Sequence, residues 1–256
     1  MRYTNESNMD NFKKVNCSSW ETLKNNVYLR LVNIKTTDKF GQDIAYQKYL
    51  DLAITFSVQE KSSQSMLTHM LTNTELENLG VSIEDVYKEA LNNTKNDRKR
   101  RVITFKESTL KNNVMYPVLT IPNEMSFATG GTSVSDCGFI EDVNPKDNTK
   151  NILMLCNKYD IFGAAYMIVP DILEEIYEKF DYENFYIIPL SVHMVMCVKS
   201  SYVTQNGDKS VYEAEDDLLD MIEAFNDQNN KTWQDILSYK IYYYIGDDGK
   251  KLFLIK

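Results

Sequence analysis

The sequence predicts an α+β fold with mostly antiparallel sheets and flanking helices, and three observations lead to this prediction. Short apolar runs rich in β-branched and aromatic residues recur along the chain and are typical of strands. Most of these runs are joined by short polar turns rather than by helices, which favours antiparallel pairing. Amphipathic segments follow the strands in both halves of the chain. Two similar lobes are therefore an open possibility beside a single unit.

The first half begins with a polar, Asn-rich stretch, residues 1–19, which we expect to be frayed or disordered. The expected elements after it are a strand or short helix at 27–33, strands at 48–58 and 65–72, and helices at 73–80 and 81–94. Gly80 is placed to end the first helix, and Ser82 with Asp85 forms a capping box for the second. Together these elements predict an N-terminal α+β lobe over residues 20–95.

The second half is expected to form a C-terminal α+β lobe over residues 96–256, with a long loop at 122–150. Its expected elements are strands at 101–105, 114–121, 151–157, 163–169, 184–191 and 193–199, helices at 171–180 and 213–225, and a terminal hairpin at 240–256. Asp171 and Glu174 fit an N-cap and its capping-box partner. Gly246 and Gly249 bracket the hairpin turn. Loops as long as 122–150 are usually functional or mobile.

Composition excludes several classes of protein. No apolar run reaches the roughly 18 residues of a membrane span, and the first residues lack a secretory h-region, so we expect a cytoplasmic protein. The net charge of −9 argues against nucleic acid as a partner, and we interpret the basic run 96–101 as a solvated linker. No glycine-rich phosphate loop occurs, so we expect no nucleotide cofactor. The remaining expectation is a protein partner.

Metal and thiol chemistry are also disfavoured. His69 and His193 are the only histidines, and no two cysteines form a C-x-x-C pair, so we predict no metal site. Cys156 and Cys197 lie in apolar runs, where a reduced cysteine behaves as a small hydrophobic residue. We therefore expect both to be buried and structural.

Several distinctive segments occur in a fixed order between about Trp20 and Tyr244. They include "VYLRLVN", "LENLGVSIEDVYKEALNNT", "NKYDIFGAAYMIVPDILEEI", "FYIIPLSVHMVMCV" and "SYKIYYY". Together they resemble a bacterial domain-of-unknown-function family, number 5688. Because the family has no established activity, the resemblance implies no mechanism. Compared with the family, this chain looks shortened at its N-terminus. It also reads Pro189-Leu-Ser-Val-His-Met194 where members tend to read Pro-Ser-Ser-x-His-Glu, and the missing acid weakens any charge-based role for that corner.

The candidate site residues centre on Ser191 and His193, a possible nucleophile and base. Residues i and i+2 of one strand lie about 6.5–7 Å apart, beyond hydrogen-bond reach, so the pair could act only from a turn. The alternative is a serine and a histidine at a strand end that bind nearby backbone. Asn157, in an expected turn, and Gly163, at an expected close approach, are weaker binding candidates.

Asp51 is a further candidate, because a carboxylate between two leucines can be either exposed or buried. It lies between Leu50 and Leu52 in the expected strand 48–58, where alternation places it on the solvent face. The alternative is a buried, hydrogen-bonded carboxylate near a site.

Three functions remain open, and we place them in this order. The first is a non-enzymatic protein-binding module that uses the sheet, the loop 122–150 and some of the 17 tyrosines. The second is a hydrolase-like enzyme with its site near Ser191 and His193. The third is a phage or mobile-element protein that inhibits a host factor through an acidic surface. Catalysis of any kind is left open, with a lean against it.

Overall fold

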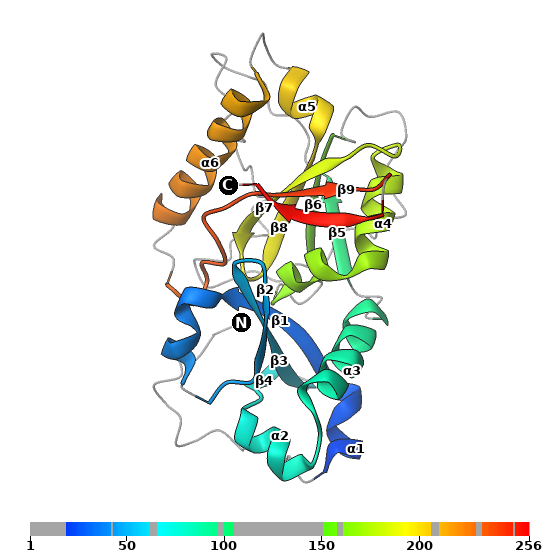
Figure 1. The fold of residues 1–256 in the computed structure, drawn as a ribbon, viewed down its shortest axis with the longest axis vertical. Helices are drawn as coiled ribbons and strands as arrows, with labels where there is room; N and C mark the ends of the chain where they lie inside the picture. Colours follow the sequence, from blue (N-terminus) through cyan, green and yellow to red (C-terminus); the bar gives the residue numbers. More distant parts are fainter. Residues whose placement is uncertain are drawn as a thin grey trace.

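The protein has an α+β fold with two antiparallel sheets, as the sequence predicts. The computed structural model describes residues 19–41, 43–61, 66–96, 100–104, 151–157, 161–205, 210–228, 232–247 and 249–255. The four-stranded sheet lies at one end of an elongated molecule and the six-stranded sheet at the other (Figure 1). The predicted strand 114–121, the loop 122–150 and nearly all of the N-terminal stretch 1–19 lie outside the described residues.

The four-stranded sheet is built on one long central strand. Its strands are β1 (Val27–Asn33), β2 (Tyr46–Tyr49), β3 (Leu52–Lys61) and β4 (Met66–Met70). β3 pairs with β1 along one edge and with β2 and then β4 along the other, always antiparallel. The ambiguous segment 27–33 is therefore a strand, and the predicted pairing of 65–72 with the preceding strand is confirmed.

Two helices follow this sheet, and the end of the first at Gly80 and the start of the second at Ser82 are those that the sequence predicts. The helical segments of this half are α1 (Trp20–Leu23), η2 (Lys24–Asn26), η3 (Ile34–Phe40), α2 (Asn73–Leu79) and α3 (Ile83–Asn96). Gly80 ends α2 with a φ of 66°, a left-handed conformation that glycine adopts without strain. Ser82 Oγ accepts the Asp85 amide at 3.1 Å and caps α3. Val86 and Ala90 of α3 are buried against the sheet.

The six-stranded sheet occupies the second half in the order β10-β9-β7-β8-β6-β5. Its strands are β5 (Arg100–Thr104), β6 (Ile152–Asn157), β7 (Phe185–Ser191), β8 (Met194–Lys199), β9 (Tyr242–Ile245) and β10 (Lys251–Leu254). The predicted terminal hairpin is confirmed, since β9 and β10 pair antiparallel across the turn that contains Gly246 and Gly249.

Helices cover both faces of this sheet and make it the middle of three layers. The helical segments are η7 (Gly163–Ile168), α4 (Pro170–Lys179), α5 (Ser200–Gln205) and α6 (Val211–Gln228). Along β7, Phe185 and Ile187 pack with α4 and η7, whereas Tyr186 and Ile188 face α6. All seven residues of β7 are buried, as expected for a strand covered on both sides. Cys156 and Cys197 are buried free thiols, as predicted.

One of the two hydrophobic clusters in the described residues extends from one sheet to the other. It includes Leu29 and Phe56 of the four-stranded sheet together with Phe185 and Tyr242 of the six-stranded sheet. The segment η7, which contacts β1, α3, β6 and β8, lies between them. None of the helices in the described part of the chain is long and apolar enough to cross a bilayer.

The prediction of a strand at 163–169 is wrong, because Gly163–Ile168 forms the 3-10 helix η7. All six residues of η7 are buried, so the segment lacks the alternation that distinguishes a strand from a buried helical turn. The helix that follows starts at Pro170 rather than at an Asp171 cap, with Val169 as N-cap. Asp171 instead forms an ion pair with Lys95 of α3 at 2.6 Å.

The prediction of one strand over 48–58 is also wrong, because Leu50 and Asp51 form the turn of the hairpin between β2 and β3. Leu50 has a φ of 54°, which is rare for a residue with a branched side chain. The local sequence offers no glycine or asparagine to signal a turn there. Contacts from elsewhere in the chain hold this turn, as described below.

Alkaline pH is expected to destabilise the protein through its buried tyrosines. The hydrogen bond from Tyr177 to Asp247 raises the pKa of Tyr177 to about 12, and burial raises the pKa of Tyr186 and Tyr242. A tyrosine with a raised pKa binds its proton more tightly in the folded state, so its stabilising effect is complete below about pH 10 and declines above it. The free energy of unfolding in urea should therefore fall between about pH 10 and pH 12. A constant value, with all tyrosines ionising near their ordinary pKa, would contradict this assignment.

Candidate functional site

The candidate pair Ser191 and His193 lies at the turn between β7 and β8. Ser191 is the last residue of β7, and Val192 and His193 form the turn before Met194 opens β8. Ser191 is 8 % exposed, and its hydroxyl accepts a hydrogen bond from the His193 amide at 3.1 Å. A serine at a strand end that bonds nearby backbone is one of the two alternatives raised by the sequence.

The His193 imidazole is directed at two other groups. Its Nδ1 accepts a hydrogen bond from the Phe162 amide at 3.1 Å, and its Nε2 lies 3.5 Å from Asp235 Oδ1. Because Nδ1 accepts, the neutral ring carries its proton on Nε2, facing the carboxylate. The hydrogen bond with His193 keeps the pKa of Asp235 below its ordinary value, and Thr232 adds to this effect. The imidazole is thus oriented as a connection between Phe162 and Asp235 rather than as a base for Ser191.

The two weaker candidates, Gly163 and Asn157, belong to different elements. Gly163 opens η7 directly after Phe162 and is buried, and the Ala164 amide donates to the Val192 carbonyl at 3.4 Å. The structure therefore brings Gly163 to the Ser191–His193 turn. Asn157 ends β6, where its backbone pairs with β5. The side chain of Asn157 lies outside the described part of the structure.

A row of stacked side chains continues from His193 into the four-stranded sheet. Its members, which we call the junction cluster, are Lys39, Phe40, Arg30, Phe162 and His193. The Phe162 and His193 rings lie 5.6 Å apart, and the Arg30 guanidinium lies 4.0 Å from the centre of the Phe162 ring. Arg30 also lies 5.2 Å from the Phe40 ring. Cation–π contacts of this kind are strongest where water is excluded, and Arg30 is only 8 % exposed.

Trp233 closes the row on the side of η3. Its ring meets the Phe40 ring edge-on at 4.8 Å, and the Lys39 ammonium lies 5.2 Å from the Trp233 ring centre. Trp233 and Asp235 belong to one short turn in which Asp235 accepts the hydroxyl of Thr232 at 2.8 Å. One turn therefore contacts both η3 and the β7–β8 turn.

Sequence reasoning missed Arg30, Trp233 and Asp235. A local signal was present for the last of these, because Thr232 and Asp235 have the spacing of a capping box. No such signal exists for Arg30, which lies in a strand and meets Phe162 only through the tertiary fold.

Asp51 forms a second link between the sheets. Its carboxylate accepts the Ser238 hydroxyl at 2.9 Å and the Tyr242 hydroxyl at 2.6 Å. Asp51 is half-buried in a hairpin turn, so the expectation that it faces solvent from a strand is wrong and the hydrogen-bonded alternative holds. The turn at Leu50 is thereby fixed to the start of β9.

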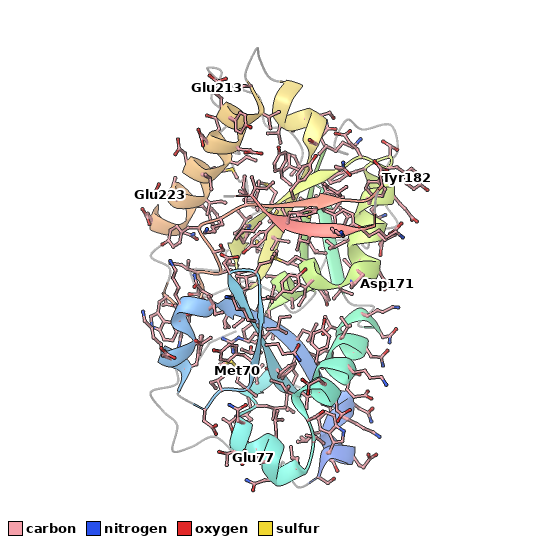
Figure 2. All side chains as sticks on the ribbon, in the orientation of Figure 1. Met70, Glu77, Asp171, Tyr182, Glu213 and Glu223 are labelled. Carbon is pink, nitrogen blue, oxygen red and sulfur yellow. The ribbon has the colours of Figure 1, made fainter. Side chains whose placement is uncertain are left out.

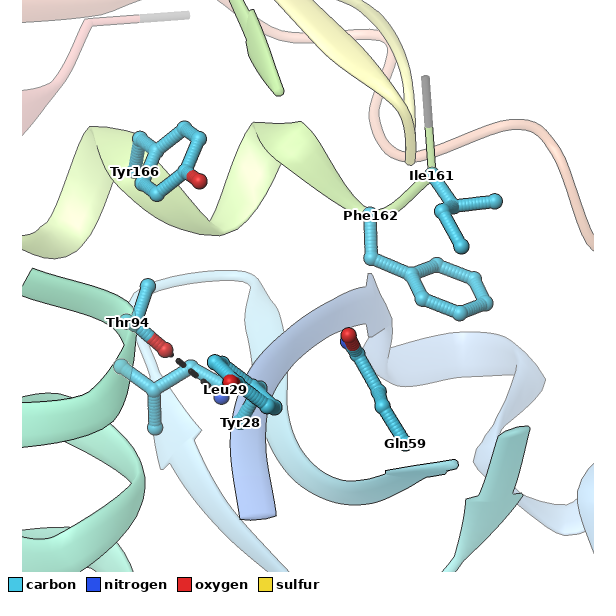
Figure 3. Close-up of a pocket in the computed structure, with 7 residues that line it drawn as sticks. All are labelled: Tyr28, Leu29, Gln59, Thr94, Ile161, Phe162 and Tyr166. Carbon is cyan, nitrogen blue, oxygen red and sulfur yellow. Dashed lines mark hydrogen bonds between the residues drawn. The ribbon is translucent and has the colours of Figure 1, made fainter. Parts of the chain in front are cut away.

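A small pocket lies between β1 and η7 (Figure 3). Its lining residues are Tyr28, Leu29, Gln59, Thr94, Ile161, Phe162 and Tyr166. Thr94 of α3 accepts the Leu29 amide at 3.0 Å and so satisfies the outer edge of β1. The cavity volume is about 10 Å³, room for roughly one water molecule. This pocket is too small for an organic substrate.

Metal and thiol chemistry find no support in the described residues. No group of three or more His, Cys, Asp or Glu side chains gathers there as a metal site would require. Burial raises the pKa of the Cys197 thiol, which keeps it protonated and unreactive.

Comparison with known proteins places most of the chain in a family. The model of a family of unknown function, DUF5688, matches residues 1–245. No curated protein and no solved structure matches the chain.

Replacing Asp51 tests the second link. Asp51→Ala leaves the buried Tyr242 hydroxyl and the Ser238 hydroxyl without their acceptor, and should lower the free energy of unfolding by about 1–3 kcal/mol. Urea unfolding followed by circular dichroism measures the change. The exposed Glu77→Ala in α2 is the control and should change stability by less than about 0.5 kcal/mol. Equal effects of the two variants would contradict a structural role for Asp51.

Replacing His193 separates its two connections. His193→Ala removes the acceptor of the Phe162 amide and the partner of Asp235, and should cost about 1–3 kcal/mol of unfolding free energy. His193→Asn can present a side-chain oxygen to the Phe162 amide and should recover part of the loss. Ser191→Ala should cost about 0.5–1.5 kcal/mol, the usual net contribution of one neutral hydrogen bond. Unchanged stability in His193→Ala would show that the ring is not a structural connection.

Proposed function

The chain belongs to DUF5688, a family of unknown function, and we propose that it is a non-enzymatic protein-binding module of the bacterial cytoplasm. The observation that carries this proposal is the outer face of α6. There, two adjacent large apolar side chains are exposed beside a row of carboxylates. An apolar centre with a polar rim is the usual composition of a protein interface.

The apolar part of this surface is formed by Val211 and Tyr212. They are 49 % and 74 % exposed, and Tyr212 is the most exposed of the large hydrophobic residues described. Tyrosine is favoured at interfaces because its ring supplies contact area while its hydroxyl remains hydrated. Burial of this pair on a partner would remove a large apolar surface from water.

The rim is acidic throughout. The exposed carboxylates of α6 are Glu213, Asp216, Asp217, Asp220, Glu223 and Asp227, and the helix contains no Lys or Arg. Glu213 and Glu223 lie on the outer side of α6, away from the sheet (Figure 2). A surface of this sign, on a chain of net charge −9, selects and steers a basic partner.

The same row supports inhibition of a host factor as a second candidate function. Successive carboxylates three or four positions apart lie about 5 Å apart along a helix. Such a row could occupy a basic surface that normally binds phosphates. This candidate is a special case of protein binding, with a nucleic-acid-binding protein as the partner.

The hydrolase alternative receives less support from the geometry. A nucleophile and its base must lie within about 2.6–3.2 Å of each other. Here the His193 nitrogens are directed at Phe162 and Asp235, and Ser191 accepts a backbone amide. These contacts favour a structural corner over a catalytic one.

The test is capture of partners from the native host with the immobilised protein. Tyr212→Ser should reduce the amount of captured partner about tenfold, the effect of losing an interface anchor. The double variant Asp220→Asn/Glu223→Gln should weaken capture and make it less sensitive to salt. The matched control is Tyr46→Ser, since Tyr46 is 41 % exposed on the other sheet. Equal capture by the wild type and both Tyr variants would contradict the assignment of this surface.

A further inference from the structure

The segment between α6 and β9 is held firmly at one end and loosely at the other. Leu237 and Ser238 are 0 % and 1 % exposed and belong to the interior. The preceding residues, Thr232–Asp235, lie at the surface with partly exposed side chains and form only a turn. We call Thr232–Asp235 the strap.

A few contacts hold the strap against the junction cluster. Trp233 meets Phe40 edge-on and Lys39 through its ring face. Asp235 approaches His193 at 3.5 Å, and its carbonyl accepts the Val192 amide at 2.9 Å. Edge-on ring pairs and partly exposed ion pairs are weak, so the strap can leave at a lower free-energy cost than global unfolding.

Part of the surface beneath the strap is held by other segments of the chain. Arg30 and Phe162 are buried side chains of β1 and of the segment before η7, and both are fixed by the core. The Phe162 amide holds the His193 ring from the other side. Release of the strap would therefore uncover one aromatic side chain, Phe40. It would also uncover Lys39 and His193, which can carry positive charge or donate hydrogen bonds.

We propose that the strap is a releasable internal ligand of the junction cluster. A partner segment with an aromatic residue two positions before a carboxylate, the pattern of Trp233 and Asp235, takes its place. This inference rests on the proposed protein-binding function and adds a second, gated surface to it. The strap itself shows which chemistry the surface accepts, since Trp233 lies against Phe40 and Lys39 and Asp235 faces His193.

The tether sets the strength of competition. A segment held by a short linker competes at an effective concentration in the millimolar range, even when its own contacts are weak. An external segment therefore binds the wild type poorly. Removal of the two strap side chains leaves the junction cluster intact and should expose its full affinity.

The first experiment measures binding of a fluorescent peptide with the sequence of Thr232–Ile236 by polarisation. The double variant Trp233→Ala/Asp235→Asn should bind it at least about tenfold more tightly than the wild type. The control peptide carries alanine at the positions of the tryptophan and the aspartate and should bind neither protein. Equal affinity for variant and wild type, or binding to neither folded protein, would overturn the proposal.

The second experiment uses the wild type and does not depend on the folding of a variant. The Val192 amide is bonded only through the strap carbonyl among the contacts described, whereas the Ile187 amide lies in the paired strand β7. Native-state hydrogen exchange of Val192 should be at least about tenfold faster than that of Ile187 and insensitive to low urea, the pattern of local opening. Exchange of both amides at the global unfolding rate would overturn the proposal, whatever the peptide does.

The two proposals can fail separately. Tyr212→Ser tests the outer face of α6 and leaves the strap untouched. Loss of capture in that variant together with no peptide binding would retain the protein-binding function and remove the strap as a ligand. Peptide binding in the strap variant with no capture of any partner would retain the strap as a ligand and remove the proposed binding surface on α6.

Discussion

The hydrogen bond from the Phe162 amide to the His193 ring fixes the segment on which the whole arrangement depends. Phe162 has a φ of 55°, a left-handed conformation that costs an aromatic residue energy and persists only where its surroundings hold it. The bond to His193 and the stacking of Arg30 on the Phe162 ring do so. From this bend the chain enters η7, whose buried residues belong to the core of both sheets. Phe162 is thus one of the residues that join the two sheets, together with the shared core and the link at Asp51.

The parts of the fold that the sequence predicted are those governed by local rules. The capping box at Ser82 and the glycine after α2 mark helix ends through backbone hydrogen bonding, which depends on neighbours in sequence. The strands of the six-stranded sheet were predicted from β-branched and aromatic content. The two wrongly predicted strands, at 163–169 and 48–58, lie where tertiary contacts override local preference. In η7 burial on all sides removes any periodicity, and at Leu50 a positive φ is maintained by hydrogen bonds to Asp51 from another sheet.

The candidate site was predicted in part for the same reason. Ser191 and His193 drew attention as neighbours in sequence, and the structure indeed places them in one turn. Their partners Phe162 and Asp235 lie 31 and 42 positions from His193 by residue number, and no pattern in a single sequence pairs them. Only the Thr232–Asp235 spacing gave a local signal, and that signal marks a turn rather than its contacts. The comparisons place the chain in a family without assigning an activity, so the chemistry of these contacts carries the functional argument.

The link at Asp51 has a consequence for the order in which the protein folds. Its two partners lie 187 and 191 positions away, close to the C-terminal hairpin. Contacts of such separation require closure of a very long loop, so they form late and contribute little to early folding. During synthesis the four-stranded sheet leaves the ribosome with its first hairpin turn strained and its carboxylate in water. That hairpin is completed only when nearly the last residues of the chain arrive.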